Sequence, residues 1–436
     1  MITLVFFRLL RAIRYFIIPF GVCFSHFAFS QSLPQGVISK NFIYQNNIKA
    51  VQFGYPESPN SLPILYLGAA SQVWLFFDDI AGDIKNYTYT IFHCDANWQP
   101  SNLMEMDYID GFNEGTIRER RNSFRTKMNF VHYELPIPND DIAFKKSGNY
   151  LLIVYENEDD KTPVITRRFM VAEDAVEINA EFVNTVASSK RNTHHEIDFE
   201  VYHKGFDIRN PQVEVQATII QNNFWEGAIT GLPPLFVNFE RLIFNYQDKV
   251  VFPALKEFRY VDLRSTNYKT DKVFDILERD TFYELILYKD KKRGGSQYSF
   301  ARDMNGEFVI QDVHENDGNT ESDYVRITLS LLSPAMIEDA DVYVLGGITD
   351  WQINENSKMR YDDITKSYYL TLMVKQGYYE YQYVTVPKGS QKVEFDDTED
   401  TWYEAEDDYT ILVYYRPFGA RFDRLIGVRT INSLRR

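Results

Sequence analysis

The chain has 436 residues and is acidic, with 46 Lys and Arg against 62 Asp and Glu and a formal net charge of −16. Because nucleic-acid phosphates repel such a protein, we exclude nucleic acid as a partner. Aromatic residues make up 16% of the chain, and apolar residues with helical spacing are scarce. The length is sufficient for two or three domains with their own apolar cores.

The first thirty residues differ from the rest of the chain. Three arginines precede an apolar run over 15–29, and an Ala-Phe-Ser sequence ends at Ser30. This order is typical of a secretory signal peptide, and the run is too short for a comfortable membrane span. Cleavage would remove three arginines and no acids, so the mature charge would be (46 − 3) − 62 = −19. We therefore expect an exported protein, not integral to the membrane, in the periplasm of a Gram-negative cell.

Export leaves Cys94 as the one cysteine of the mature chain, so we expect no intrachain disulfide. Cys94 lies within Tyr87–Ser101, YTYTIFHCDANWQPS, beside a histidine and an aspartate. This triplet could suggest a thiolate or a metal site. However, neighbouring residues on a strand point to opposite faces, so His93 and Cys94 cannot act as a pair. We interpret Cys94 as a buried core thiol beside a hydrogen-bonded histidine.

Short alternating runs of apolar and polar residues recur from about residue 41 to 172, with Pro, Gly and Asn between them. This pattern is typical of strands in an antiparallel β-sandwich, which we place in a first domain over 31–174. The predicted strands are Ile48–Phe53, Gln72–Phe77, Tyr87–Cys94, Lys127–Leu135, Asn149–Glu156 and Ile165–Val171.

The alternation stops over 95–126, which reads as a long connection containing several aromatic residues. Long loops inside compact domains often carry a function, so the first hypothesis is that Trp98, Tyr108 and Phe112 contact a partner. The alternative is a loop folded over one sheet edge with its aromatic side chains packed down.

Two further series of alternating runs predict a second sandwich over 175–320 and a third over 321–416, followed by a solvated tail over 417–436. We expect His194 and His195, neighbours on a predicted strand, to be exposed or edge residues without a metal. The runs of both series are Val176–Val183, His194–Tyr202, Val213–Gln221, Glu257–Arg264, Asp271–Leu277, Tyr283–Lys289, Asp323–Leu332, Asp341–Gly346, Ser367–Val374, Tyr378–Val384 and Asp408–Tyr415.

The third series contains VYVLGGITDW, ending at Trp351, and later an aromatic strand, YYEYQYV. This order resembles the early-set sandwich, an immunoglobulin-type fold, of glycogen- and starch-binding modules. The resemblance implies that Trp351, helped by a basic residue in the aromatic strand, stacks on a glucan. Here Gln382 stands where that basic residue is expected, and Trp402 lies in an acidic run. We therefore interpret Trp351 as a structural residue whose side chain fills its own loop. Glycan binding through Trp351 and Trp402 remains the alternative function.

The order of motifs along the whole chain resembles the plug protein family of the Bacteroidota type IX secretion system. The motifs are NIKAVQF, LFFDDI, YTIFHCDANWQPS, SGNYLLIVYE, TRRFMV, EFRYVDLRS, VYVLGGITDW and VYYRPFGARFDRLIG. The resemblance implies a periplasmic protein that binds the periplasmic opening of a very large outer-membrane β-barrel translocon. It also implies that the protein seals this channel when no cargo is loaded.

No catalytic motif competes with this reading. The sequence contains neither GxSxG nor HExxH, and no Cys or His cluster has metal-ligand spacing. Acidic pairs such as Asp78-Asp79 are chain neighbours and indicate turn chemistry. We therefore predict an all-β protein of three consecutive sandwiches that is no enzyme and has no cofactor, metal or small-molecule substrate.

Overall fold

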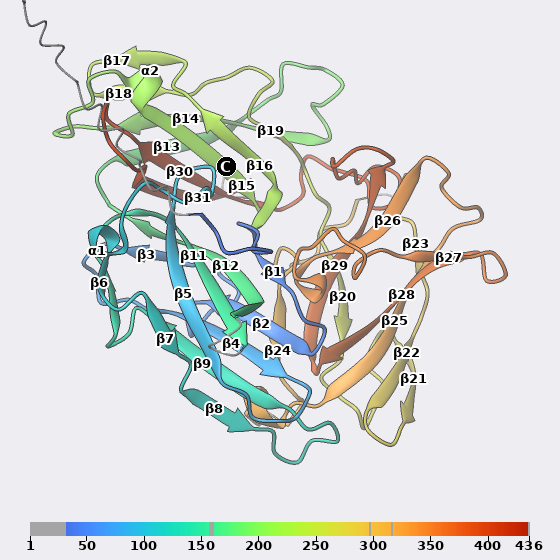
Figure 1. Ribbon diagram of the computed structural model, residues 1–436. Helices are drawn as coiled ribbons and strands as arrows, with labels where there is room; N and C mark the ends of the chain where they lie inside the picture. Colours follow the sequence, from blue (N-terminus) through green and yellow to red (C-terminus); the bar gives the residue numbers. More distant parts are fainter. Residues whose placement is uncertain (1–31, 157–160, 296–297, 315–316, 435–436) are drawn as a thin grey trace, which may run out of the picture.

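The computed structural model describes residues 32–156, 161–295, 298–314 and 317–434. The predicted signal peptide lies outside these ranges. The three α-helices have only four residues each, and nothing helical within the ranges has the length and apolar character of a membrane span. They are α1 (Glu105–Tyr108), α2 (Pro211–Glu214) and α3 (Gly318–Glu321). The prediction of an all-β fold is confirmed, because the described residues form six β-sheets and very little helix (Figure 1).

The first module is a sandwich whose core lies between a four-stranded sheet and half of a ten-stranded sheet. Phe77, Tyr87 and Tyr133 show how the alternating aromatic residues build this core, since their ring centroids lie 4.8–5.2 Å apart. The strands of the module, with two short ones at its edge, are β1 (Phe42–Ile43), β2 (Ile48–Gly54), β3 (Ile64–Tyr66), β4 (Val73–Asp79), β5 (Tyr87–Cys94), β6 (Ile109–Gly111), β7 (Glu114–Thr116), β8 (Glu119–Asn122), β9 (Val131–Ile137), β10 (Ile142–Phe144), β11 (Gly148–Glu156) and β12 (Thr162–Ala172).

The second module packs a five-stranded sheet against the other half of the ten-stranded sheet. In its strand β14, Ile197, Phe199 and Val201 point inward and are fully buried, as the alternation predicts. The strands of this module are β13 (Glu177–Val183), β14 (His194–Tyr202), β15 (Val215–Gln221), β16 (Phe224–Leu232), β17 (Phe236–Asn238), β18 (Arg241–Ile243), β19 (Val251–Pro253), β30 (Asp408–Tyr415) and β31 (Arg424–Asn432).

The third module has its own core between a four-stranded and a six-stranded sheet. A short 3-10 helix, η1 (Gly347–Thr349), follows β26 at the position of the GGITDW motif. Its strands are β20 (Arg259–Asp262), β21 (Val273–Glu278), β22 (Tyr283–Leu287), β23 (Asp290–Lys291), β24 (Phe308–Ile310), β25 (Tyr324–Leu332), β26 (Ala340–Leu345), β27 (Arg360–Asp362), β28 (Ser367–Lys375) and β29 (Gly377–Pro387).

The strands do not group strictly by the consecutive ranges expected from the sequence. β20 to β22 belong to the third core, whereas β30 and β31 return to the second. The segment over 417–436 is therefore not simply a solvated tail, since Leu425 and Ile426 in β31 are fully buried. Alternation fixes which face of a strand is apolar but does not fix which strand it pairs with.

His195 also differs from its prediction as an exposed or edge residue. It is fully buried in β14, which is paired on both sides. Its Nδ1 lies 2.8 Å from the Tyr409 hydroxyl and its Nε2 2.8 Å from the carbonyl oxygen of Tyr403. His194, on the opposite face, is half-buried. The hydrogen-bond partners of His195 lie more than 200 residues away in the chain, where no local pattern can indicate them.

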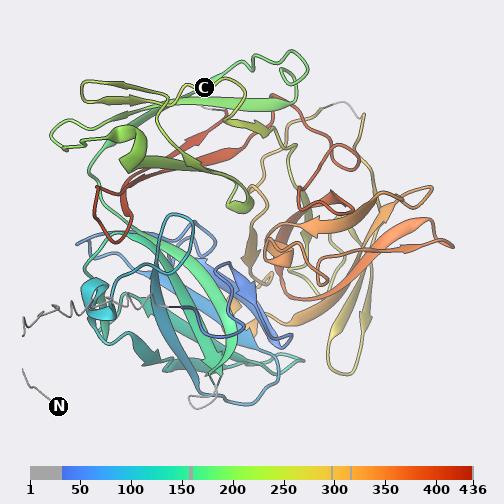
Figure 2. The ribbon, with the colours of Figure 1, turned by 45° about the horizontal axis from the view of Figure 1, so that its top comes forward.

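The ten-stranded sheet joins the first module to the second without a break. β12 and β31 run parallel and meet at Ala172 and Leu425. In Figures 1 and 2 the three modules lie at the corners of a triangle, the first in blue and teal, the second in green and red, and the third in yellow and orange. Each module therefore lies beside both of the others.

Candidate interaction surfaces and module junctions

Two of the three predicted partner-contact residues are core residues. Trp98 is 4% exposed and Tyr108 is fully buried, whereas Phe112 is 74% exposed. The Trp98 ring meets Trp225 edge-on at 5.0 Å, and the guanidinium of Arg168 lies over both rings. The Tyr108 hydroxyl donates to the carbonyl of Ile91 at 3.2 Å. The hypothesis of partner contact is therefore wrong for Trp98 and Tyr108 and stays a prediction for Phe112.

The segment over 95–126 is folded over the sheet edges, as the alternative held. It contains α1 and three short strands, of which β6 pairs with β10, β7 with β5 and β8 with β9. Four of its large apolar side chains stay exposed, namely those of Met104, Met106, Phe112 and Phe124. Sequence reasoning missed both methionines because methionine is as common in cores as on binding surfaces.

The His93-Cys94 pair has the predicted arrangement. His93 Nδ1 lies 2.9 Å from the Ser101 hydroxyl and Nε2 lies 3.1 Å from the carbonyl oxygen of Ser147. Burial lowers the pKa of His93 to about 4. Cys94 is fully buried on the other face, in a separate apolar cluster, and burial raises the pKa of its thiol. The Cys94 thiol therefore stays protonated at neutral pH, and His93 on the opposite face cannot take its proton.

The two tryptophans of the glycan alternative lie in different surroundings. Trp351 is half-buried, and its ring lies 5.8 Å from that of Phe258 and 6.2 Å from that of Phe224 in the second module. It therefore fills a junction between modules as well as its own loop. Trp402 is 37% exposed and stacks on Tyr298 at 5.8 Å. Among the described residues, no ring contact joins Trp351 to Trp402.

The junction of the first and third modules is centred on a buried carboxylate. Asp78, at the end of β4, lies 2.7 Å from Lys375 Nζ and accepts a hydrogen bond from the Tyr324 hydroxyl at 2.7 Å. His132 Nδ1 lies 2.6 Å from its other oxygen. All four side chains are buried.

The charge of Asp78 follows from these contacts. Burial by itself raises the pKa of the carboxyl, but the Lys375 ammonium and the His132 hydrogen bond outweigh it and leave the pKa below its usual value. Burial likewise opposes protonation of His132, but its hydrogen bond to the Asp78 carboxylate and the nearby Glu134 carboxylate raise its pKa overall. Asp78 is thus an ionised group with its partners supplied by both modules.

Further contacts surround this carboxylate. The Asp323 side chain accepts a hydrogen bond from the backbone N–H of Lys127 at 2.7 Å, and the Phe124 N–H donates to the carbonyl of Thr320 at 2.9 Å. A second ion pair joins the buried Arg167 of β12 to the partly buried Asp350 after η1 at 2.8 Å.

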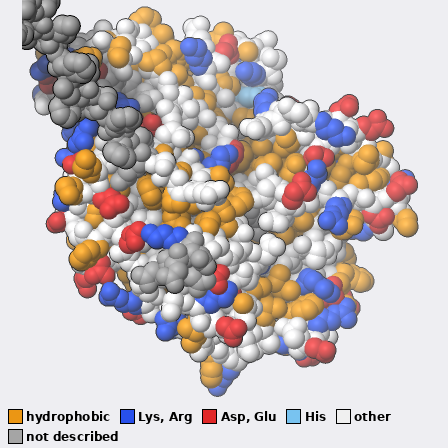
Figure 3. Space-filling view, viewed as in Figure 1, with side chains coloured by type: hydrophobic (Ala, Val, Ile, Leu, Met, Phe, Trp, Pro, Cys, Tyr) orange, Lys and Arg blue, Asp and Glu red, His pale blue; other side chains and the backbone are white. Residues whose placement is uncertain are grey.

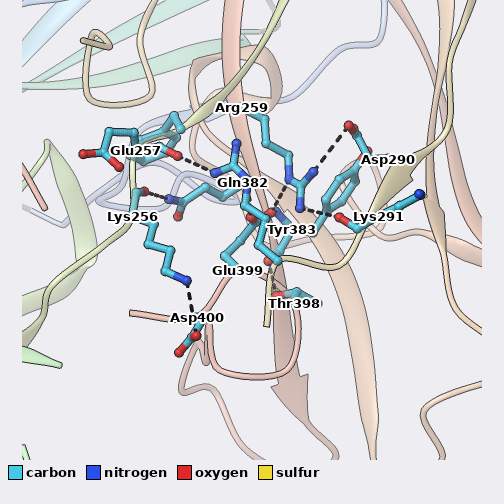
Figure 4. Close-up of polar contacts among 12 residues, drawn as sticks. Lys256, Glu257, Arg259, Asp290, Lys291, Gln382, Tyr383, Thr398, Glu399 and Asp400 are labelled. Atoms are coloured by element: carbon cyan, nitrogen blue, oxygen red, sulfur yellow. Dashed lines mark hydrogen bonds and ion pairs between the residues drawn. The ribbon is translucent and has the colours of Figure 1, made fainter. Parts of the chain in front are cut away.

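Residues 254–258 form the linker between β19 of the second module and β20 of the third, and a polar cluster of the third module holds this linker (Figure 4). Arg259, 4% exposed, contacts Glu399 at 2.7 Å, Asp290 at 3.3 Å and the carbonyl of Lys291 at 2.8 Å. Gln382 Nε2 donates to the carbonyl of Lys256 at 2.6 Å. Gln382, which departs from the glycan-binding pattern, therefore anchors the linker backbone.

Direct contacts between the second and third modules complete this junction. Asn223 donates to Glu307 at 3.1 Å and Asn305 donates to Asp408 at 3.1 Å. An apolar cluster lies beside them, formed by Phe224, Leu255, Phe258, Leu345, Val384 and Phe395. Within the described part of the chain, no group of three or more His, Cys, Asp or Glu is placed to hold a metal ion.

Comparisons with known proteins identify the family. Residues 48–173 match the family described as the Type 9 secretion system plug protein 1st domain. A hypothetical protein from Parabacteroides merdae ATCC 43184, known from its crystal structure, is 33% identical over 91% of this chain and 100% of its own, with a TM-score of 0.88. No curated protein matches the sequence.

A second solved structure, trypsin-activated alpha-2-macroglobulin from Escherichia coli, aligns at 11% identity over 87% of this chain and 27% of its own. Its TM-score is 0.18. The first-module match and the similarity to the Parabacteroides protein over nearly the whole chain agree with the motif order, and the chain belongs to the family of type 9 secretion system plug proteins.

Proposed function

We propose that the protein is a non-enzymatic plug that binds the periplasmic opening of the giant outer-membrane β-barrel translocon of the type IX secretion system and seals it when cargo is absent. The observation that carries this proposal is the closed triangle of modules, in which every module is joined to both others by buried contacts. A protein that blocks a wide channel must keep its shape, because a change of shape would open a path for solutes. Sealing itself requires no chemistry.

The energetics of the junctions support such a rigid body. Separating the first and third modules would break the buried contacts that Asp78 makes with Lys375 and Tyr324. Separating the first and second modules would break a sheet and expose the Trp98–Trp225 contact. Hinge motion at these two junctions is therefore unfavourable.

Location in the periplasm forms part of the same proposal. The arginine-rich start, apolar run and Ala-Phe-Ser sequence are the features that support export. Fractionation of cells should recover the protein, shortened by about thirty residues, with the outer-membrane fraction after gentle lysis and in the soluble periplasmic fraction after a high-salt wash. Recovery from the cytoplasm at full length would contradict this location.

The direct test uses the purified translocon in a planar lipid bilayer. Adding the folded protein to the periplasmic side should lower the conductance of the open channel, and dilution should restore it. The unfolded protein at equal concentration is the control. Binding without a fall in conductance would exclude sealing, and the absence of both would exclude the proposal.

The glycan-binding alternative gains no comparable support, because Trp351 fills a module junction and Trp402 stacks on Tyr298. We expect isothermal titration with α-glucans to give no binding heat. If heat appears and is lost in Trp402→Ala while the fold is retained, the third module binds glycans after all.

A further inference from the structure

A cavity of about 260 Å³ lies at the junction of the first and third modules. Residues 48–51 of β2 and 371–375 of β28 form opposite parts of its wall. Figures 1 and 2 both show the blue strand β2 on the side of the first module that faces the orange third module. Asn46 and Asn356 in the wall are exposed, so the cavity opens to solvent. Its volume is just below the range of small-ligand sites, roughly 300–1,000 Å³, and admits a short segment but no folded domain.

The two strands meet this cavity with their edges. A sheet face would contribute alternate residues of each strand, whereas here consecutive residues line the cavity. Among the described residues, β2 pairs only with β4. β28 pairs with β25 along its length, but on its other side β27 reaches only residues 367–369. The edge over 370–375 therefore offers backbone N–H and C=O groups with which an extended peptide can pair.

The charges of the wall favour an anionic ligand. Lys49, Lys375 and Asp350 line the cavity, so their sum is 2 − 1 = +1, whereas the whole chain carries −16. Lys375 is paired with Asp78 and Asp350 with Arg167. Lys49 is half-buried, burial lowers its pKa, and no ion pair or hydrogen bond joins its side chain to another described residue. A carboxylate in the cavity would pair with this ammonium and stabilise its charged form.

The backbone beside Lys49 departs from a regular strand. The pairing of β2 with β4 shifts register between Lys49 and Gln52, and Ala50 has a left-handed conformation at φ +51°. This conformation is strained for a residue with a Cβ, and β-bulges often change the direction of a side chain at a binding site. The strain therefore lies next to the unpaired ammonium. Because a bulge also disrupts pairing at a strand edge, β28 is the more regular of the two edges.

The outer surface does not concentrate anions by itself. On the face drawn in Figure 3, acidic and basic side chains are interspersed without a large region of one sign. Long-range attraction of a free anion to this face is therefore weak. Recognition in the cavity depends on direct contacts, and a carboxylate on an extended chain can contact both the ammonium and a strand edge.

We propose that the cavity between β2 and β28 binds a short extended peptide that contains an acidic residue. The peptide backbone pairs with the free edge of β28, and its Asp or Glu carboxylate pairs with the Lys49 ammonium of β2. Such a peptide contacts the first and third modules at once and so holds their junction closed. This inference goes beyond the proposed function and does not depend on it.

The test begins with random hexapeptides displayed on phage and selected on the folded full-length protein. The selection should enrich sequences that contain Asp or Glu. The most enriched peptide is then labelled and titrated by fluorescence anisotropy. Lys49→Gln should weaken its binding by about tenfold or more, as expected for loss of a charge-assisted hydrogen bond. Lys204→Gln is the matched control, because Lys204 is exposed in the second module, and it should change the affinity by less than about twofold.

Two changes to the peptide test its carboxylate and its backbone. Replacing its acidic residue by the corresponding amide should weaken binding to the wild type as much as Lys49→Gln does, with little further loss when both changes are combined. Methylation of the backbone nitrogens of alternate residues should abolish binding for one of the two alternate sets, because a strand pairs with one neighbour through every second residue. Since Lys49 makes no ion pair with a described residue, urea unfolding should show Lys49→Gln as stable as the wild type.

Three results would overturn the inference. The first is a selection without acidic residues, and the second is equal affinity of the wild type and Lys49→Gln for the selected peptide. The third is binding that is unaffected by methylation of either alternate set. Sodium acetate is the probe for a free carboxylate. Millimolar acetate should leave the peptide bound, and complete displacement would show that the cavity takes small carboxylates and not a peptide.

Discussion

The two junctions of the first module are built from opposite chemistry. Toward the second module, a continuous sheet and an apolar layer containing Trp98, Cys94 and Leu412 make the contact. Toward the third module, the contact is centred on the ionised Asp78 with Lys375 and His132. Apolar burial stabilises without reference to direction or pH, whereas a buried ion pair is stabilising only in one geometry and one protonation state.

This difference shows how a protein of several β-sandwich modules is stabilised and how its modules are held in one relative orientation. The apolar junction supplies favourable burial, and the ionic junction fixes the angle at which the third module docks, because any other angle leaves a charge unpaired. We expect the ionic junction to be the one that responds to pH and to single substitutions of charge.

The largest expected effect comes from removing Lys375. Lys375→Met leaves Asp78 buried with His132 as its remaining charged partner and should lower the free energy of unfolding by about 3 kcal/mol near pH 7, measured by urea unfolding followed by far-UV circular dichroism. Because the folded-state pKa of Asp78 lies below its usual value of 3.8, its contribution is present above that pH and is lost as pH falls through the folded pKa. The cost of Lys375→Met should therefore shrink below about pH 4.

The double variant Asp78→Asn/Lys375→Met is the control for this effect. It removes both charges, so its stability should exceed that expected from adding the two single losses. Additive losses would mean that Asp78 and Lys375 do not act as a pair. The junction between the first and third modules would then not depend on a buried ion pair.

The apolar junction should lose stability without a dependence on pH. Trp98→Ala removes a buried indole between Trp225 and Arg168 and should cost about 3–4 kcal/mol, with the same value at pH 5 and pH 8. Trp98→Phe keeps a ring in the site and should cost less. If the cost of Trp98→Ala varied with pH as strongly as that of Lys375→Met, the two junctions would not differ in the way described.

The histidines of the two regions should respond to pH in opposite directions. The pKa of His93 falls from 6.5 to about 4, so its neutral form is favoured by roughly 3 kcal/mol, and this stability is lost as pH falls from about 6.5 to 4. In His93→Asn, the unfolding free energy should therefore fall less over that range than in the wild type. Equal pH profiles for the two chains would show that His93 takes up its proton without disturbing the fold.

For His132 the sign is reversed. Its pKa is raised above 6.5, so its contribution is fully present below that value and is lost as pH rises through the folded pKa. His132→Gln should therefore cost more stability at pH 6 than at pH 9. A larger cost at pH 9 would contradict the assignment of a protonated His132 beside Asp78.

The smallest effect should come from the exposed rim of the ionic junction. Arg121, whose side chain is 46% exposed, pairs with Asp317 and Glu134, and Arg121→Met should cost no more than about 1 kcal/mol. The cost should fall further in 1 M salt, which screens exposed pairs. A cost as large as that of Lys375→Met would place the energy of the junction at its rim and not at its buried centre.

Local patterns in the sequence predicted much of the fold but little of the candidate interaction site. The alternation over 196–201 correctly indicated that Ile197, Phe199 and Val201 are buried, and the strand register correctly separated His93 from Cys94. For the aromatic residues of 95–126, no sequence pattern indicated which side chains are buried and which are exposed. Trp98 and Tyr108 are buried and Phe112 is exposed, because that outcome depends on elements distant in the chain, such as β16 with Trp225.

By itself the sequence determined that this protein is built of β-strands, which residues of most strands face a core, and, through the order of its motifs, which family it resembles. The tertiary structure alone decided that β30 and β31 complete the second core, that Asp78 finds its cation 297 residues later, and that β2 and β28 line one cavity. The physical reason is range. A side-chain alternation is fixed by backbone geometry within a strand, whereas strand pairing and charge pairing depend on the summed contacts of segments that meet only when the whole chain has folded.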